Sequence, residues 1–354
     1  MLVTEESIKL DLPKKTVDDP HHAFVFYNPV MQFSRSISSL ALSVSKASRV
    51  LDGLSASGAR GLRYYKENDL DKVVFVDANP DAVKTCKKNL KLNKVKAKVL
   101  GQDLNQFFLT TEEKFDFIEI DPFGTPAPFL KNAFACGDKK FFLSVTATDL
   151  ANLCARKEAC FKYYQSLPLN IDCTHEIALR IFIKKIAQEA IQNEYSCKPL
   201  FSFYKGHYVK AVLYCEKYVS AKALENIGYL NYDPETIERS FSSNPGEKFG
   251  GPLWIGKLQD SEFLKKMISL NKKRNYADKE KINSFLDLLL AENDFDSPFI
   301  DLSQLADHYN KSMDFKMNEL VSKLNKKGKK TTRVHYNPYG IKTTASFKEL
   351  RSSF

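Results

Sequence analysis

Between Arg49 and Thr148 the sequence repeats one unit, a short apolar run followed by a turn and then a helical pattern. This alternation predicts a mostly parallel α/β sheet, because parallel strands must be joined by crossover helices. The runs expected to form its strands are 50–51, 73–76, 97–100, 115–120 and 141–145. Two later runs, 200–204 and 208–215, have no long helix between them, so we expect them to close the sheet with an antiparallel edge hairpin.

The turn after the first strand distinguishes two kinds of nucleotide-binding sheet. A dinucleotide-binding fold has Gly-x-Gly-x-x-Gly there, so that the backbone can approach a pyrophosphate. Gly53, Gly58 and Gly61 are spaced for a wider turn. Together with the closing hairpin, this spacing favours the sheet of the class I methyltransferases, a Rossmann-like fold whose cofactor, S-adenosyl-L-methionine, carries no phosphate.

Three successive strands are each followed by an acidic residue, namely Asp77, Asp103 and Asp121. Ligands of open α/β sheets bind at the carboxyl ends of the strands, so we expect these side chains to lie at one binding edge. Asp77 is placed to accept both ribose hydroxyls of a cofactor, and Asp103 lies near the expected position of an adenine amino group. Any one of them could be a turn-forming Asp without a ligand, but three in succession favour a binding site.

Asp121 opens the turn Asp-Pro-Phe-Gly directly after the apolar run 115–120. The turn places a carboxylate and the aromatic ring of Phe123 at the end of a buried strand, and this pairing suits chemistry on the amino group of a flat base. Pro122 restricts the backbone of Asp121, so the turn is expected to be stiff. The alternative is that Asp121 caps the next helix and Phe123 packs into the core, and the turn alone does not decide between the two.

Two arginines suit the other end of such a cofactor. Arg35 and Arg60 could hold its carboxylate through paired N–H donors, as guanidinium groups do well. A structural salt bridge is the alternative for each of them, and for Arg35 taken alone it is the better interpretation.

The chain has 354 residues, of which 43% are hydrophobic and 27% charged, so it can bury a large core and is expected to form two domains, 1–240 and 241–354. It has no run of about 18 apolar residues and no N-terminal basic segment followed by an apolar one. We therefore expect neither a membrane span nor a secretory signal, and a cytoplasmic location. The seven cysteines form no C-x-x-C pair and are expected to be reduced, mostly buried thiols. Cys173 and His175 lie close together, but a structural zinc would need a second such pair.

The net charge of +10 is concentrated near the C-terminus, where residues 311–354 hold eleven Lys and Arg against three acidic residues. A basic segment on a nearly neutral body favours a polyanion partner, most simply a nucleic acid, although a solvated face without a partner is the alternative. We expect two short helices over 302–324 and a hairpin over 325–344 with Gly328 at its turn, a winged-helix-like α+β arrangement. The side chains expected to meet phosphates are Lys326, Lys327, Lys329, Lys330 and Arg333.

Five short motifs, in order along nearly the whole chain, resemble those of the tRNA guanine-26 N2-dimethyltransferases. They are VFYNPVM at 25–31, DGLSASGARGLR at 52–63, IDPFG at 120–124, GGPLWIGKL at 250–258 and HYNPYGIKT at 335–343. The resemblance implies an enzyme that transfers one and then a second methyl group from S-adenosyl-L-methionine to the exocyclic N2 amine of guanosine 26 in tRNA. It implies that Asp121 is catalytic and that Phe26 and Phe123 sandwich the guanine. The residues that it implies for contact with the cofactor are Arg35, Arg60, Asp77, Asp103 and Leu104.

The sequence departs from this family in two places. The family usually has Asn-Arg-Asp where this chain has Ser34-Arg35-Ser36, so the support around Arg35 is thinner. Many members also carry four zinc-binding cysteines in the region that corresponds to 231–251, and this chain has none there. We therefore expect no metal, and a segment that is held by packing or left loose.

Two other functions stay open at this stage. One is methylation of another base amine, such as that of adenine in DNA, although enzymes of that kind usually have a second Pro where Phe123 stands. The other is a tRNA-binding factor that keeps the fold without catalysis, which Asp121 and the intact cofactor turn argue against. We expect the chain to be a monomer.

Overall fold

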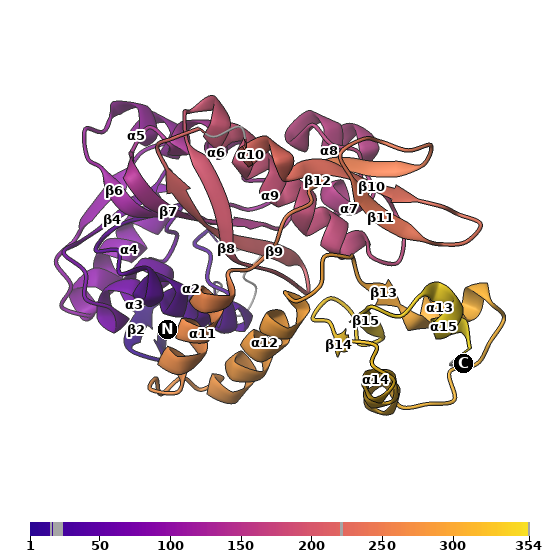
Figure 1. Cartoon of the computed structure of the whole chain (residues 1–354). Coiled ribbons are helices and arrows are strands. Elements are labelled where there is room, and N and C mark those ends of the chain that lie inside the picture. Colours follow the sequence, from indigo (N-terminus) through magenta and orange to yellow (C-terminus); the bar gives the residue numbers. More distant parts are fainter. Residues whose placement is uncertain (15, 17–23, 220–221, 353–354) are drawn as a thin grey trace.

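The structure is a computed structural model that describes residues 1–14, 16, 24–219 and 222–352 (Figure 1). At its centre lies a seven-stranded sheet with the order β5-β4-β3-β6-β7-β9-β8. The first five strands in this order are parallel, and β9 is antiparallel to both of its neighbours. The predicted sheet with its antiparallel edge hairpin is therefore confirmed. The strands are β3 (Arg49–Gly53), β4 (Lys72–Asp77), β5 (Lys98–Gly101), β6 (Phe115–Ile120), β7 (Gly137–Ala147), β8 (Ser196–Lys205) and β9 (Tyr208–Glu216).

Helices cover both faces of this sheet (Figure 1). Successive side chains of a strand point to opposite faces, so Leu51 and Val74 join one core while Val50 and Phe75 join the other. The first face is covered by α5 (Leu104–Thr110), α6 (Ala127–Ala133), α7 (Leu150–Cys154), α8 (Lys157–Tyr164) and α9 (Thr174–Gln192). The second is covered by α2 (Gln32–Ser45), α3 (Ala59–Glu67), α4 (Pro80–Leu92), α11 (Ser261–Asn271) and α12 (Lys279–Glu292).

Local sequence explains where several of these helices begin. The side chain of Asn79 accepts a hydrogen bond from the backbone N–H of Asp81, and Pro80 occupies the first helical position of α4. Asp103 caps α5 by accepting from the N–H of Gln106 at 3.0 Å. α9 carries an apolar stripe of Ile177, Ile181, Ile186 and Ala190 at helical spacing, and all four residues are buried in the core.

The region of 231–251, where this chain lacks the zinc-binding cysteines that the resemblance implies for many members, belongs to a three-stranded antiparallel sheet of β10 (Ile227–Tyr232), β11 (Arg239–Ser242) and β12 (Phe249–Trp254). This sheet packs on α9 and buries Leu230 and Leu253. Arg239 forms an ion pair with Asp172, and Arg180 donates to the backbone oxygen of Trp254 at 3.0 Å. Packing and polar contacts thus hold the segment in place. Among the described residues no three His, Cys, Asp or Glu side chains are grouped as a metal site would require.

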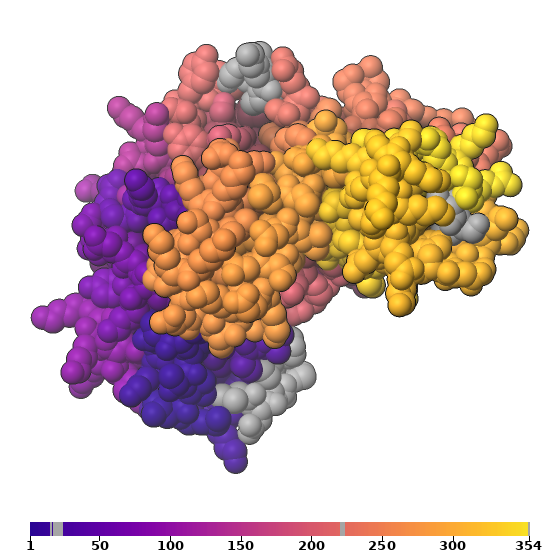
Figure 2. Space-filling model, turned by 60° about the horizontal axis from the view of Figure 1, so that its bottom comes forward, coloured from indigo at the N-terminus to yellow at the C-terminus, as the bar shows by residue number. Residues whose placement is uncertain are grey.

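The C-terminal segment forms a separate small core beside α12, visible as the yellow lobe at one side of the molecule (Figure 2). Helix, strand, two helices and a hairpin follow one another here, which is the order of a winged helix. After α12 these elements are β13 (Ile300–Asp301), α13 (Leu302–His308), α14 (Met317–Lys326), β14 (Thr331–Arg333) and β15 (Gly340–Thr343), followed by α15 (Phe347–Arg351). In the sheet β15 lies between β13 and β14.

The expectation that Gly328 forms the hairpin turn was wrong. Gly328 has a φ of +76° and ends α14, where the N–H of Lys329 donates to the backbone oxygen of Leu324 at 3.0 Å. The turn between β14 and β15 is made by residues 334–339. The expected domain boundary between 240 and 241 is also misplaced, because it would cut β11 and separate that strand from β10, with which it pairs.

The expectation of seven reduced cysteines was wrong for one pair. Cys197 and Cys215 lie directly opposite each other on β8 and β9 and are joined by a disulfide. The other five are free thiols, four of them buried.

The remaining elements are a hairpin of β1 (Leu2–Glu5) and β2 (Ile8–Asp11), the short 3-10 helix η2 (Pro29–Met31) and α10 (Lys222–Glu225). Within the described part of the chain, no helix has both the length and the apolar character needed to cross a bilayer.

Candidate active site

The expected acidic residues meet at the carboxyl edge of the parallel strands. Gly53, at the end of β3, lies opposite Val76 of β4 on one side and Ile120 of β6 on the other. Asp77 lies opposite Gly101, the last residue of β5. The strand order therefore reverses at β3, because β4 and β5 follow on one side of it and β6 and β7 on the other. Open α/β sheets bind their ligands at such a switch point.

The turn after β3 is held in an unusual backbone conformation. Leu54 and Ala56 both have positive φ, at 63° and 46°. Such a conformation costs a non-glycine residue about 1 to 3 kcal/mol, so the surroundings must hold it. The N–H of Ser55 donates to the backbone oxygen of Val76 at 3.0 Å, and the N–H of Ala56 donates to Asp77 Oδ2 at 2.7 Å. The strained turn is thus fastened to the end of the neighbouring strand.

Two glycines in this turn are required by close packing. A Cβ on Gly58 would lie 2.7 Å from the thiol sulfur of Cys86, and one on Gly61 would lie 2.4 Å from the ring of Phe75. Both distances are shorter than van der Waals contact, so only glycine lets α3 begin so close to α4 and β4.

The hydrogen-bond acceptors at this edge fit an adenosine. Each carboxylate oxygen of Asp77 accepts one backbone N–H, from Ala56 and from Asn79, which leaves further lone pairs free for hydroxyl donors. Asp103 is exposed at the start of α5, and Leu104 beside it is buried against Gly53. The structure thus brings Asp77, Asp103 and Leu104 to the edge predicted for the cofactor.

Arg35 is engaged elsewhere in the fold. Its Nε donates to Glu5 Oε1 at 2.7 Å and its Nη2 donates to Glu5 Oε2 at 2.5 Å, with both side chains buried. Burial would raise the pKa of Glu5, but the cations Arg35 and Arg63 hold it below its usual value. Arg35 thus forms the structural salt bridge that was its alternative interpretation, and its contact with a cofactor stays a prediction.

Asp121 forms an ion pair with Arg60, whose Nη1 also donates to Ser38 Oγ at 3.1 Å. Burial would raise the pKa of Asp121, but Arg60 and Lys210 hold it below its usual value. The next helix, α6, begins only at Ala127, so Asp121 does not cap it. Asp121 is therefore a carboxylate at neutral pH, and the expected contact of Arg60 with the cofactor stays a prediction.

Phe26 and Phe123 come together, but not as a sandwich. Their ring centroids are 4.8 Å apart and their planes lie at 89°, so they meet edge to face. A base between two rings needs them parallel and about 7 Å apart, which is twice the contact distance of carbon atoms. Phe26 and Phe123 therefore do not form the parallel pair of rings that the resemblance implies around a guanine. Phe123 is 73% exposed and does not pack into the core, so a face of this ring is open to a ligand.

The Asp-Pro-Phe-Gly turn is fixed to the loop after β7. The N–H of Gly124 donates to Thr148 Oγ1 at 2.8 Å, and the N–H of Thr148 donates back to Gly124 O at 3.0 Å. Thr125 shares a 2.9 Å hydrogen bond with the hydroxyl of Tyr164 on α8. The turn is therefore held by hydrogen bonds to two other parts of the fold, which agrees with the stiffness expected of it.

Sequence reasoning missed the charged pair that lies behind this turn. Glu119 on β6 and Lys210 on β9 are completely buried and lie 2.7 Å apart. A charged residue within an otherwise apolar strand was the available signal, in FDFIEI at 115–120 and YVKAVLY at 208–214.

Of the five basic residues predicted to meet phosphates, three already have partners. Lys329 pairs with Glu349 at 2.7 Å, Lys330 pairs with Asp294 at 2.8 Å, and Arg333 donates to Asn318 Oδ1 at 2.9 Å. Lys326 and Lys327 form no ion pair with any described residue. They line an open depression on α14 together with Asn318, Glu319, Ser322 and Lys323.

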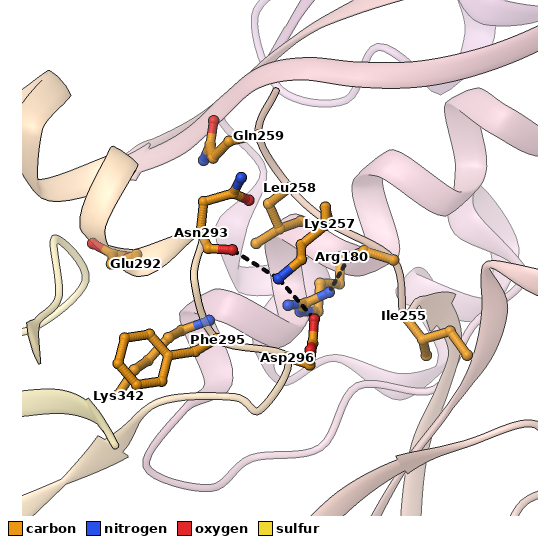
Figure 3. Close-up of a pocket in the computed structure, with 11 residues that line it drawn as sticks. Arg180, Ile255, Lys257, Leu258, Gln259, Glu292, Asn293, Phe295, Asp296 and Lys342 are labelled. Atoms are coloured by element: carbon orange, nitrogen blue, oxygen red, sulfur yellow. Dashed lines mark hydrogen bonds and ion pairs between the residues drawn. The ribbon is translucent and has the colours of Figure 1, made fainter. Parts of the chain in front are cut away.

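A second polar site lies between α9 and the C-terminal core (Figure 3). Its lining includes Arg180, Lys257, Glu292 and Lys342, but its cavity of about 10 Å³ has room for no more than about one water. Lys257 Nζ contacts Asp296 at 2.8 Å and Asn293 O at 2.7 Å. This site is a joint between two parts of the fold and is too small for a substrate.

Comparison with known proteins places the whole chain in one group. A family described as N2,N2-dimethylguanosine tRNA methyltransferase matches residues 6–353. A tRNA (guanine(26)-N(2))-dimethyltransferase of Methanococcus maripaludis is 33% identical over 366 aligned positions, which cover 99% of this chain and 96% of that protein. The corresponding protein of Metallosphaera sedula is 36% identical and covers 94% and 89%.

A solved structure agrees with these matches. The complex of Trm1 from Pyrococcus horikoshii with S-adenosyl-L-methionine superposes with a TM-score of 0.92 and is 30% identical. The match covers 100% of this chain and 99% of that one. The likeness therefore includes the α/β sheet, the β10–β12 sheet and the C-terminal core.

Proposed function

This chain belongs to the N2,N2-dimethylguanosine tRNA methyltransferase family, and we propose that it transfers methyl groups from S-adenosyl-L-methionine to the exocyclic N2 amine of guanosine 26 in tRNA. The observation that carries the proposal is Asp121, an ionised carboxylate beside the exposed ring of Phe123 at the ligand-binding edge of the sheet. An acceptor and a stacking surface side by side suit an amine on a flat base.

The residues at the edge of the sheet fit the cofactor, which supplies a methyl group on a positively charged sulfur when bound. We propose that Asp77 receives the ribose hydroxyls and that Asp103 and Leu104 lie against the adenine. The spare lone pairs of Asp77 and the exposure of Asp103 support this assignment. Contact of Arg35 and Arg60 with the cofactor's carboxylate is also proposed, and each guanidinium would then donate both to its present carboxylate partner and to the carboxylate of the cofactor.

Asp121 acts as the proton acceptor. The amine is a poor nucleophile, because its lone pair is delocalised into the ring. A hydrogen bond from an amine N–H to Asp121 localises the lone pair, and the carboxylate takes that proton as the C–N bond forms. The amine carries two hydrogens and loses one in each transfer, so Asp121 finds an N–H twice and no third time. Two successive transfers follow from this count.

The base must leave its stack to reach Asp121. Extruding a base costs a few kcal/mol, and stacking on an aromatic side chain returns about 1 to 3 kcal/mol. The open face of Phe123 can supply that stacking without change, whereas a contribution from Phe26 requires one of the two rings to turn.

We propose that the C-terminal lobe binds the phosphates of the tRNA through Lys326 and Lys327. This proposal is supported by the absence of ion pairs between these two lysines and any described residue. Lys329, Lys330 and Arg333 would join them by exchanging their present partners for phosphates. We also propose that the chain acts as a monomer in the cytoplasm, and light scattering at assay concentration would test the first half of this statement.

The experiment is nucleoside analysis of tRNA after incubation with the protein and S-adenosyl-L-methionine. We expect N2-methylguanosine to appear first and N2,N2-dimethylguanosine to replace it, with neither formed on a tRNA that carries adenosine at position 26. Methylation of adenine in duplex DNA would support the rival base-amine activity. Tight binding of tRNA without any methylated nucleoside would support the non-catalytic rival.

A further inference from the structure

A buried network of charged groups lies directly behind Asp121. Glu119 accepts hydrogen bonds from Lys210 Nζ at 2.7 Å and from the hydroxyl of Tyr64 at 2.7 Å. Arg60 spans the gap, with its Nε 3.8 Å from Glu119 Oε1 and its Nη2 on Asp121. Two cations and two carboxylates thus alternate in the order Lys210, Glu119, Arg60, Asp121.

Further titratable groups lie close to these four side chains. Asp52 on β3 is buried and accepts from the N–H of Gly61 at 2.8 Å. Burial raises its pKa to about 7, although Arg60 opposes the rise. Arg60 on α3 and Lys210 on β9 act on the charge of Asp121, and a hydrogen bond from Thr146 on β7 also favours its carboxylate. Asp52 on β3 and Tyr208 on β9 interact with Asp121 as well, while Tyr64 on α3 interacts with Glu119 and Arg60.

The balance of the network depends on Lys210. With Lys210 present, Glu119 has its own cation at 2.7 Å, so Arg60 is free to face Asp121. Without Lys210, Glu119 would be an uncompensated charge in the core and would draw Arg60 toward itself. Asp121 would then lose its partner and part of the positive potential that keeps it ionised.

We propose that Lys210 and Glu119 are positioning residues for methyl transfer: Lys210 neutralises Glu119, which leaves Arg60 to fix the direction and the charge of the Asp121 carboxylate. The proposal rests on the proposed role of Asp121 as proton acceptor. Stability alone is a poor reason for the pair, because a buried ion pair is often no more stabilising than apolar residues of the same size.

The test is the pH dependence of single-turnover methylation, measured from pH 5 to 8 with saturating tRNA and cofactor. The unaltered protein should show no acid limb in this range, because Arg60 and Lys210 hold the pKa of Asp121 below its usual value. Asp52 titrates inside the window in every variant, but its protonation removes a negative charge near Asp121 and so favours the Asp121 carboxylate. Lys210→Met leaves the effect of burial with less opposition, so the pKa of Asp121 should rise, an acid limb should enter the window, and the rate at pH 5 should be several-fold lower than at pH 8. The double variant Lys210→Met, Glu119→Gln removes both charges, returns Arg60 to Asp121 and should lose the limb again.

The chain offers a matched control in the pair Lys342 and Glu176. This pair is also buried, with Nζ 2.9 Å from Oε1, but it belongs to the joint between α9 and β15. Lys342→Met should disturb the fold as much as Lys210→Met without bringing an acid limb into the profile. If Lys210→Met does not fold, Glu119→Gln carries the test, because both cations then act on Asp121 and the less basic carboxylate should slow transfer several-fold.

A folded Lys210→Met protein with a flat profile, or Glu119→Gln with an unchanged rate, would overturn the proposal. Asp121→Asn separates this failure from that of the proposed function. If Asp121→Asn is slow while Lys210→Met stays flat, only the positioning role is lost. If Asp121→Asn transfers methyl groups at the normal rate, Asp121 is not the acceptor and both proposals fall.

Discussion

At the scale of single residues, opposing effects set the chemistry of Asp121. Burial favours the neutral acid, while Arg60 and Lys210 favour the carboxylate, and the cations prevail, because the pKa of Asp121 lies below its usual value. The same ion pair makes Asp121 a weaker base. A weak base is still sufficient for this step, because the amine becomes strongly acidic as the C–N bond forms.

Removal of this carboxylate should affect chemistry far more than binding. Asp121→Ala should lower the single-turnover rate of methylation by roughly 100-fold to 10,000-fold, the usual contribution of general base catalysis. The affinity for S-adenosyl-L-methionine should stay close to normal, as measured by calorimetry on the same preparation. A variant that turns over at nearly the normal rate would remove Asp121 from the mechanism.

Asp77 should behave in the opposite way. If it receives the ribose hydroxyls, Asp77→Ala should weaken cofactor binding by about 1.5 to 3 kcal/mol, the range for hydrogen bonds to a charged group. Part of the loss would come from the turn itself, because Asp77 also holds the N–H of Ala56 at 2.7 Å. Asp77→Asn keeps an oxygen acceptor for that N–H, so it serves as the control. Calorimetry with equal affinity for all three proteins would contradict the assignment.

At the scale of elements, the periodic pattern of the sequence predicted the strands and helices, but it could not decide between two equally good turn signals. The strand ends at Asp77, Asp103 and Asp121 were predictable, because parallel strands bring their carboxyl ends to one edge. Gly328 and Asn337-Pro338 are both good turn signals, and only the pairing of β14 with β15 shows which of them closes the hairpin. The ion pair of Arg60 with Asp121 joins residues 61 positions apart, so no local pattern could indicate it.

The joint between α9 and the C-terminal core gives a prediction at this scale. Glu176 on α9 accepts from Arg180, from Lys342 on β15 at 2.9 Å and from the backbone N–H of Phe299 at 3.0 Å. Burial would raise the pKa of Glu176, but Lys342 and Arg180 lower it to about 2. Glu176→Gln should therefore lower the free energy of unfolding at pH 7 by about 3 to 5 kcal/mol, because it leaves two buried cations without their carboxylate.

The pH dependence of this effect has a definite sign. The pKa of Glu176 is lower in the folded protein than the ordinary 4.5, so its contribution is fully present above about pH 4.5 and is lost as the pH falls toward 2. The difference between Glu176→Gln and the unaltered protein in urea unfolding should shrink between pH 5 and pH 3. Glu319→Gln, which alters an exposed ion pair on α14, should change stability by no more than about 0.5 kcal/mol at either pH.

At the scale of the whole molecule, the proposed chemistry and most of the net charge lie in two different regions. The α/β body is close to neutral and carries the proposed chemistry, whereas the C-terminal lobe, which is the yellow region of Figure 2, holds most of the net charge. Ion pairs within the fold already engage Lys329 and Lys330. Net charge alone therefore overstates how many side chains are free to meet phosphates.

The lysines of the lobe form two sets, those with an ion-pair partner and those without one, and a binding experiment can distinguish them. Each lysine that neutralises a phosphate contributes about 0.7 to 0.9 to the slope of log affinity against log salt. Lys326→Ala with Lys327→Ala should flatten the slope for tRNA by about 1.5, because neither lysine pairs with a described carboxylate. The matched control is Lys329→Ala with Lys330→Ala, which removes the same charge from side chains that have partners and should flatten the slope less. Cofactor affinity should not change in either protein. Equal slopes for all three proteins would mean that the lobe is only a solvated face, and would move the tRNA site to the neutral body.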